Sequence, residues 1–231
     1  MEKTVSYCLC DNCEFRDLAM KYLDDESINK LCENKKENLY RKGEIIYHQD
    51  DKITDFKYLK RGLVKLYRRK GLNDEQIITI TRNFDFINSI SVFEEEKYRF
   101  SVAALEDSEI CSINIEIMKK LLTENGNFAT GILVRMSNIY EKIIAQFLEI
   151  RKRNLAGRVA FVLLYFAREI FNSNIFDLPV LRKEIADYIG MSTANVIRTL
   201  SEFKYDGIIK VYGKTIEIVD LNKLKVFSDK G

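Results

Sequence analysis

Apolar residues recur at two different spacings along this chain, and the change of spacing divides it into parts. From about Asn38 to Ile115, short apolar runs alternate with turn residues such as Gly43 and Gly62. The runs cover residues 45–47, 56–59, 63–67, 76–81, 100–105 and 109–113. Several short runs separated by regular turns are typical of β-strands in a sandwich or barrel. We therefore predict an N-terminal β-barrel over residues 35–126, preceded by an arm over residues 1–34.

Beyond about Ile115 the apolar spacing becomes helical. One narrow stripe repeats in steps of three and four residues through Leu133, Met136, Tyr140, Ile143, Phe147 and Ile150. A single helix cannot bury such a stripe alone, whereas a second copy buries it in a parallel coiled coil. The pattern predicts a long dimerisation helix over residues 127–153 and a homodimer. A further helix over residues 155–171 is apolar on most sides, and we expect it in the core of a C-terminal domain over residues 154–231.

Residues 181–209, LRKEIADYIGMSTANVIRTLSEFKYDGII, have the spacing of a helix-turn-helix. Leu181, Ile185 and Ile189 lie four residues apart and give the first helix one apolar face. Gly190 ends that helix, and Ser192 is a favourable N-cap for the next one. The segment therefore predicts two short helices joined by a tight turn.

The second of these helices has one face suited to a protein core and another suited to a DNA major groove. Val196, Leu200 and Phe203 share the apolar side, and Ile197 borders it. Because an Arg can form two hydrogen bonds to a guanine edge, Arg198 is the strongest candidate for reading a base. The other residues expected at the DNA are Ser192, Thr193, Ala194, Asn195 and, as phosphate contacts, Thr199 or Ser201.

Two β-prone runs follow, over residues 208–211 and 215–219, joined around Gly213 and Lys214. Such a hairpin beside a helix-turn-helix is a wing, and Lys214 at its turn is placed to contact the phosphate backbone. A basic cluster also precedes the helix-turn-helix, formed by Arg151, Lys152, Arg153 and Arg158.

Composition excludes some classes of protein but does not indicate a function. The chain has 231 residues, 46% of them hydrophobic and 31% charged, with a net charge of +2, which is too small to indicate nucleic-acid binding by itself. No apolar run reaches the ~18 residues of a membrane span and the N-terminus does not resemble a signal peptide, so we expect a cytoplasmic protein without a membrane partner.

A barrel, a long helix and a winged helix-turn-helix, in this order, resemble the Crp/Fnr family of bacterial transcription regulators. The resemblance rests on YRKGEII at residues 40–46, YLKRGLVK at 58–65, ALEDSE at 104–109, and residues 184–207 with GKTI at 213–216. It implies an α+β protein whose N-terminal barrel is a jelly roll of the cyclic-nucleotide-binding type. It also implies a homodimer that senses a signal, moves about a hinge near Asn154 and binds a near-palindromic operator on double-stranded DNA. RNA polymerase is a further partner if the protein is an activator.

The effector is not identified by the resemblance. Cyclic-nucleotide binders of the family hold the phosphate with a glycine-flanked turn, a Glu and an Arg-Ser pair. The corresponding residues 86–101 contain no glycine, Ser89 stands at the Glu position, and Phe100 follows Arg99 in place of the Ser. Because glycine permits the close backbone approach that cradles a phosphate, this effector pocket of Ser89, Arg99 and Phe100 argues against cyclic AMP.

The cysteines are the alternative candidates for sensing the signal. The oxygen-sensing branch of the family binds a [4Fe–4S] cluster through three N-terminal cysteines and one in the barrel, which implies Cys8, Cys10, Cys13 and Cys111 here. The N-terminal spacing differs from that branch, so zinc, thiol redox sensing and a purely structural role stay open. Cys32 is interpreted as a spare, buried thiol.

The resemblance also bears on the operator and on other classes of function. Ala194 stands where relatives carry a Glu that contacts cytosine, and Ile197 replaces a small or hydroxylated residue, so the half-site should differ there. An enzyme is not favoured, since the chain has no phosphate loop, nucleophile elbow or histidine pair. A ligand-binding protein that acts through protein contacts without DNA is the other alternative.

Overall fold

The computed structural model describes residues 14–71, 74–82, 85–87, 92–93 and 96–230. They form two compact units: unit 1 takes in residues up to 69 together with 80–141, and unit 2 takes in 70–79 together with 142–231. Three elements run from one unit into the other. They are β4 (Leu63–Gly71), β5 (Asp74–Arg82) and the long helix α4 (Gly126–Arg151).

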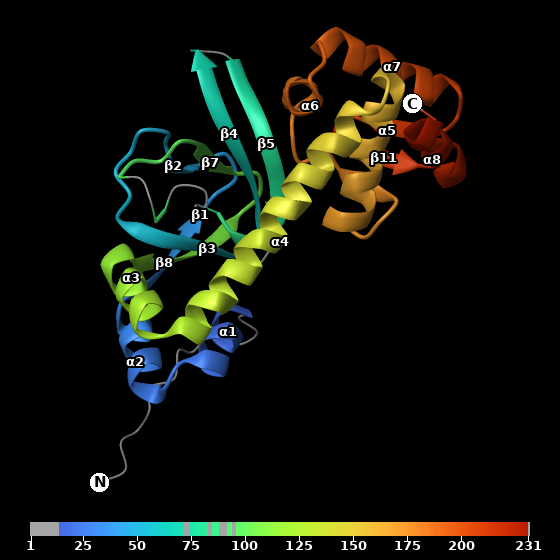
Figure 1. Cartoon of the computed structure of the whole chain (residues 1–231). Helices are drawn as coiled ribbons and strands as arrows, with labels where there is room; N and C mark the ends of the chain where they lie inside the picture. Colours follow the sequence, from blue (N-terminus) through green and yellow to red (C-terminus); the bar gives the residue numbers. More distant parts are fainter. Residues whose placement is uncertain (1–13, 72–73, 83–84, 88–91, 94–95, 231) are drawn as a thin grey trace. The chain divides into compact units, whose positions relative to one another are not determined.

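Two four-stranded sheets make up the predicted barrel (Figure 1). The first has the order β1 (Lys35–Tyr40), β8 (Ser108–Asn114), β3 (Asp55–Arg61) and β6 (Asp85–Phe86). The second has the order β2 (Ile45–Tyr47), β7 (Ser101–Ala104), β4 and β5. The six predicted strands are present. Strands β1 and β6 were not predicted, because KKENLY carries no apolar alternation and β6 has only two residues.

Helices cover the first sheet through an aromatic cluster. Helix α1 (Glu14–Tyr22) inserts Phe15, whose ring lies 6.1 Å from Phe56, 5.5 Å from Tyr58 and 5.9 Å from Phe86. Phe128, near the start of α4, completes the cluster at 6.4 Å from Phe15. Helices α2 (Asp25–Glu33) and α3 (Ile115–Glu124) pack on each other beside it.

Helix α4 is apolar on two faces. Phe128 and Ile132 are 0% and 1% exposed in unit 1, and Ile150 is 6% exposed in unit 2. A second set of apolar side chains faces outward with 52–61% exposure: Leu133, Val134, Ile144, Phe147 and Leu148. The predicted stripe is therefore partly wrong, since Ile150 packs within its own unit. The exposed set is the one available to a partner helix.

Unit 2 contains the predicted helix-turn-helix and wing. Its elements are α5 (Leu155–Tyr165), which continues as a π-helix (Phe166–Ile170), β9 (Ile175–Asp177), α6 (Arg182–Ile189), α7 (Thr193–Tyr205), β10 (Ile209–Tyr212), β11 (Thr215–Ile218) and α8 (Leu221–Lys230). The wing is an antiparallel pair in which Ile209 lies opposite Ile218. Two elements were not predicted: β9, which adds a third strand beside β11, and α8, which packs on α5.

The segment between α4 and α5 is held by a buried arginine. Arg153 is 7% exposed, and its guanidinium donates to the Glu149 carboxylate at 2.7 Å and to Ser228 Oγ of α8 at 3.2 Å. It also lies 4.6 Å from the centre of the Phe161 ring. Asn154 then caps α5 by accepting from the Gly157 amide at 2.9 Å. The place of Arg153 in a basic cluster of the sequence had indicated a surface position. Arg153 is instead a buried structural residue.

The predicted α+β architecture is confirmed: a β-sheet domain, a long helix and a winged helix-turn-helix domain follow one another. Within the described residues, no helix is both long and apolar enough to cross a membrane.

Packing of α1 on α4 depends on a glycine and gives a first prediction. A Cβ at Gly131 would lie 2.9 Å from Tyr22 Cε2 and 3.0 Å from Leu18 Cδ1, whereas a Cβ at Gly126 would meet nothing within 4 Å. We expect Gly131→Val to lower the free energy of unfolding by about 1–3 kcal/mol more than Gly126→Val, since only the side chain at position 131 overpacks a contact. Urea denaturation of the two variants measures the difference, and equal losses would contradict the assigned contact.

Candidate nucleic-acid interface

The turn between α6 and α7 follows from two residues. Gly190 has φ of 65°, a left-handed conformation that favours glycine, and its amide donates to Ala186 O at the end of α6. Ser192 then caps α7, its hydroxyl accepting from the Asn195 amide at 3.2 Å. Arg158 Nη1 donates to Ile189 O at 3.1 Å, so α5 also binds the last turn of α6. Arg158 is therefore engaged inside unit 2.

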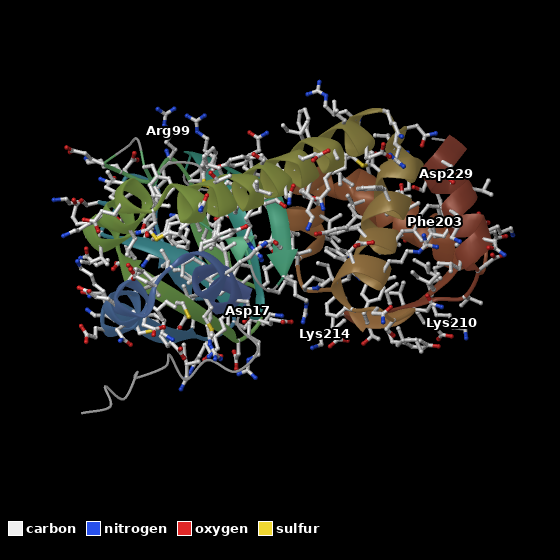
Figure 2. The ribbon with its side chains drawn as sticks, turned by 60° about the horizontal axis from the view of Figure 1, so that its bottom comes forward. Asp17, Arg99, Phe203, Lys210, Lys214 and Asp229 are labelled. Atoms are coloured by element: carbon white, nitrogen blue, oxygen red, sulfur yellow. The ribbon has the colours of Figure 1, made fainter. Side chains whose placement is uncertain are left out.

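Helix α7 is buried along one side only. Val196, Leu200 and Phe203 are 0%, 4% and 2% exposed, and the Phe203 ring lies 5.1 Å from Phe227 of α8. Figure 2 labels Phe203 in the interior of unit 2. The opposite side forms an exposed row one helical turn apart, which we call the reading face: Ala194, Ile197, Arg198 and Ser201. Among the other predicted residues, Ser192 is exposed and Thr193 and Asn195 are half-buried.

Two side chains, Thr199 and Leu181, lie on other faces than predicted. Thr199 is 2% exposed, so the phosphate contact predicted for Thr199 or Ser201 is left to the exposed Ser201. Ile197, predicted to border the apolar side and to face the operator, is 47% exposed on the reading face. Leu181, expected on the apolar face of α6, is 72% exposed because it is the N-cap residue and precedes the helix; its amide donates to the Glu184 carboxylate at 2.7 Å.

Three basic side chains on this surface, Arg198, Lys210 and Lys214, lie beside acids. Arg198 Nε is 3.7 Å from Glu202 Oε1, one turn further along α7. On the wing, Lys214 Nζ is 2.6 Å from Asp177 Oδ2, and Lys210 Nζ is 3.3 Å from Glu217 Oε1. These pairs are solvent-accessible, with side-chain exposures of 64%, 71% and 53% for Arg198, Lys214 and Lys210, so each cation can exchange its partner for another anion. Figure 2 shows Lys210 and Lys214 at one edge of unit 2.

The wing is fastened to the start of α6. Arg182 Nη2 donates to Gly213 O in the wing turn at 3.3 Å, and Leu178 N donates to Lys214 O at 2.9 Å. Thr215 Oγ1 donates to Asp177 Oδ1 at 2.6 Å, which joins β11 to β9. Wing turn and helix-turn-helix are therefore held together as parts of one surface.

Two of the three candidate effector residues, Arg99 and Phe100, lie within the described part of the barrel. Ser89 lies outside the described residues, Arg99 is exposed and Phe100 is half-buried. Tyr98, next to Arg99, is 4% exposed and stacks on Tyr47 with ring centres 3.8 Å apart. Arg99 and Phe100 lie in the bend between Tyr98 and strand β7, and Arg99 is exposed there. Burial also raises the pKa of Tyr47 well above its ordinary value.

Two of the five cysteines, Cys32 and Cys111, lie within the described residues. Cys8, Cys10 and Cys13 lie outside the described residues. Cys111 is a thiol, 1% exposed, on the side of β8 that carries Ile113 and lies opposite Tyr58 of β3. Cys32 is half-buried and disulfide-bonded, so its interpretation as a spare buried thiol was wrong. No three His, Cys, Asp or Glu side chains are grouped as metal ligands within the described ranges, which therefore supply one of the four thiolates that a [4Fe–4S] cluster takes.

Comparison with known proteins agrees with both halves of this architecture. Residues 37–125 match the family of cyclic nucleotide-binding domains, and residues 157–227 match the Crp-like helix-turn-helix domain. Electron transport regulator A of Shewanella oneidensis is 26% identical over 227 residues, which cover 95% of this chain and 90% of that protein. The fumarate and nitrate reduction regulatory protein of Vibrio cholerae is 26% identical over 220 residues, covering 91% and 86%.

A solved structure shows the same fold. The crystal structure of a Crp/Fnr family transcriptional regulator from Eubacterium rectale superposes with a TM-score of 0.77 at 19% identity, covering 91% of this chain and 97% of that one. Domain matches, relatives and fold agree with a cyclic-nucleotide-binding-like β domain followed by a Crp-like helix-turn-helix domain. The chain belongs to the Crp/Fnr family of DNA-binding transcription regulators, which are not enzymes.

Proposed function

We propose that this regulator acts as a homodimer on a near-palindromic DNA operator, with α7 in the major groove and the wing turn on the phosphate backbone. The observation that carries the proposal is the two-sidedness of α7, which buries Val196, Leu200 and Phe203 and leaves the reading face exposed. Family members bind DNA and act as dimers. A two-fold axis brings two such helices to two half-sites about one helical turn of DNA apart.

Each residue of the reading face has a distinct role in this proposal. Arg198 reads a guanine, and Glu202 beside it restrains the guanidinium before DNA binds. Ala194 and Ile197 are apolar and contact thymine methyl groups, so they specify bases without hydrogen bonds. Ser192, Thr193 and Asn195 surround the helix N-terminus, where backbone amides favour a phosphate. Lys214 contacts the phosphate backbone from the wing. RNA polymerase is a further partner if the protein activates transcription.

The signal in this proposal is not cyclic AMP. Residues 86–101 contain no glycine to cradle a phosphate, Arg99 is exposed, and Phe100 stands where cyclic-nucleotide binders carry a Ser. The effector is therefore another ligand of the barrel or a change at the cysteines.

Replacing Arg198 and Lys214 tests the assignment of base and phosphate contacts. We expect Arg198→Ala to cost about 1–3 kcal/mol of binding on the selected operator and to relax the preference at one base pair of each half-site. Lys214→Ala should instead weaken all duplexes alike and reduce the salt dependence of binding, because a phosphate contact carries no sequence information.

Selection from a random duplex library followed by titration at several salt concentrations measures both effects. Leu181→Ala serves as a control, since it removes an exposed side chain from unit 2 at a position assigned no DNA contact. A uniform loss of affinity for Arg198→Ala across all sequences would remove it from base reading. A wild-type protein that selects no sequence would overturn the proposed function.

The exposed apolar set of α4 predicts the dimer. Ile144 is 58% exposed, and a charge there cannot be buried against a partner helix without a large desolvation cost. We expect Ile144→Glu to be a folded monomer with strongly reduced operator affinity, and Ile144→Leu to remain dimeric. Sedimentation velocity with circular dichroism distinguishes these states, and a dimeric Ile144→Glu protein would place the interface elsewhere.

A [4Fe–4S] cluster held by Cys8, Cys10, Cys13 and Cys111 needs all four as thiolates, so it requires the disulfide of Cys32 to be reduced. It predicts a brown protein after anaerobic purification, with iron and sulfide that are lost in air. Four thiolates hold such a cluster, so Cys111→Ser should lose the colour as well. Absorbance spectra with iron, sulfide and zinc analysis are the measurement. A colourless, metal-free wild-type dimer would exclude the cluster and leave small molecules in the barrel as effectors.

A further inference from the structure

One carboxylate of unit 2 binds two neighbouring residues of the wing. Asp177 Oδ2 lies 2.6 Å from Lys214 Nζ, and Asp177 Oδ1 accepts from Thr215 Oγ1 at 2.6 Å. Thr215 is the residue of β11 that lies directly opposite Asp177 of β9. The next amide along the chain, that of Leu178, donates to Lys214 O at 2.9 Å. The wing lysine is therefore bound at its ammonium group and at its backbone by two successive residues.

The position of the Asp177 carboxylate is fixed by the residues on either side of it. Phe176 and Leu178 are 5% and 6% exposed, and the Phe176 ring stacks on Phe171 with ring centres 5.4 Å apart. Because protein interiors are close-packed, β9 cannot carry the carboxylate away from the wing without disturbing the core of unit 2. Lys214 has a flexible four-carbon side chain, so its ammonium group is the mobile partner of the pair.

Exchange of this ion pair for a DNA phosphate has a definite consequence. The side chains of Lys214 and Asp177 are 71% and 48% exposed, so water reaches both and the pair can open. The carboxylate, held by Thr215, does not leave with the lysine. A phosphate that takes Lys214 must therefore displace Asp177 and then lie near it as a like charge.

We propose that Asp177 competes with the DNA backbone for Lys214 and so lowers the affinity of the regulator for every duplex. This inference rests on the proposed DNA-binding function. Asp177 contacts neither base nor phosphate in this role and acts through the wing lysine. Because a phosphate contact carries no sequence information, the competition changes the affinity for all duplexes alike and leaves the base preference unchanged.

The competition also affects the salt dependence of binding. A cation that neutralises one phosphate releases counterions and contributes about −0.9 to the slope of log affinity against log salt concentration. A lysine that comes with its own carboxylate neutralises less of the DNA charge. Removing the negative charge of Asp177 should therefore steepen the slope.

Asp177→Asn tests the proposal with little change of shape, because the amide oxygen still accepts from Thr215. Glu217→Gln is the matched control: it removes a charge from another exposed ion pair of the same sheet, 3.3 Å from Lys210, which has no contact in the proposed complex. Asp177→Asn is also combined with Lys214→Ala. The probes are the duplex selected by the wild-type protein and a random-sequence duplex of equal length, titrated between about 50 and 200 mM salt.

We expect Asp177→Asn to bind both duplexes roughly 2- to 5-fold more tightly than the wild-type protein at low salt, the range for an exposed ion pair. The slope should steepen by up to about 0.9, and the ratio of operator to random-duplex affinity should stay the same. The gain should be markedly smaller in the Lys214→Ala background, where only screened repulsion is removed. Glu217→Gln should behave as wild type. Asp177→Ala, which lacks the acceptor as well, should show the same gain as Asp177→Asn.

Four results would overturn the inference. An unchanged affinity and salt slope would show that Asp177 does not compete, and a fall in affinity would show that it positions Lys214 for DNA instead. An equal gain with and without Lys214, or in Glu217→Gln, would reduce the effect to general charge repulsion. A base preference that changes at one position would assign Asp177 to base reading. Failure of the proposed function is a separate result, because a wild-type protein that selects no duplex fails before any variant is compared.

Discussion

Burial of one face of α7 is the constraint on which the DNA-binding unit depends. Val196, Leu200 and Phe203 are almost fully enclosed by α5, α6, β10 and α8, and each such side chain contributes about 1.5–3 kcal/mol when it is removed from water. This packing determines the rotation of α7 about its own axis, and the same rotation determines which residues face outward. A helix that could roll by one position would exchange Arg198 for Thr199. Recognition of bases therefore begins with the core residues behind the helix.

The same reasoning applies to α4, which serves two purposes on two faces. Its inward side chains, such as Phe128, Ile132 and Ile150, belong to the cores of the units, whereas Ile144 and Phe147 remain exposed. Since the inward face is enclosed in both units, rotation of α4 is restricted along its 26 residues. A displacement of α4 would therefore disturb the core packing of its neighbours within each unit.

Sequence periodicity predicted the elements that have a strong local pattern and failed where tertiary partners decide. The six apolar strand runs and the helix-turn-helix were recognised because alternation and helical spacing are local properties. Strand β1 was missed since its side chains are mostly polar and it is stabilised by pairing with β8, in which Glu37 lies opposite Cys111. Strand β9 owes its existence to β11 in the same way.

Individual site residues were harder to predict than elements. Neighbouring helical positions differ by about 100° in direction, so small errors in locating the centre of an apolar face exchange buried and exposed residues at its border. Thr199 lies beside Leu200 at the border of the apolar face; it was predicted at the DNA but is buried, whereas Ile197 at the border beside Val196 is exposed as its predicted place at the operator requires. Arg153 shows a related limit, because three adjacent basic residues with Arg158 close by indicate a surface until a buried partner such as Phe161 is known.

Paired charges explain how a DNA-binding surface can exist in a chain with a net charge of only +2. Arg198, Lys210 and Lys214 lie beside Glu202, Glu217 and Asp177, so the surface has little excess positive charge before DNA arrives. Exposed ion pairs contribute about 0–1 kcal/mol, which a phosphate can replace at small cost. Attraction to arbitrary DNA is reduced by these acids, since non-specific affinity comes almost wholly from phosphate contacts. In the proposed complex, contacts from the reading face to bases then supply a larger share of the binding free energy. Discrimination between sequences can therefore be high even though these three cations are paired with acids before DNA binds.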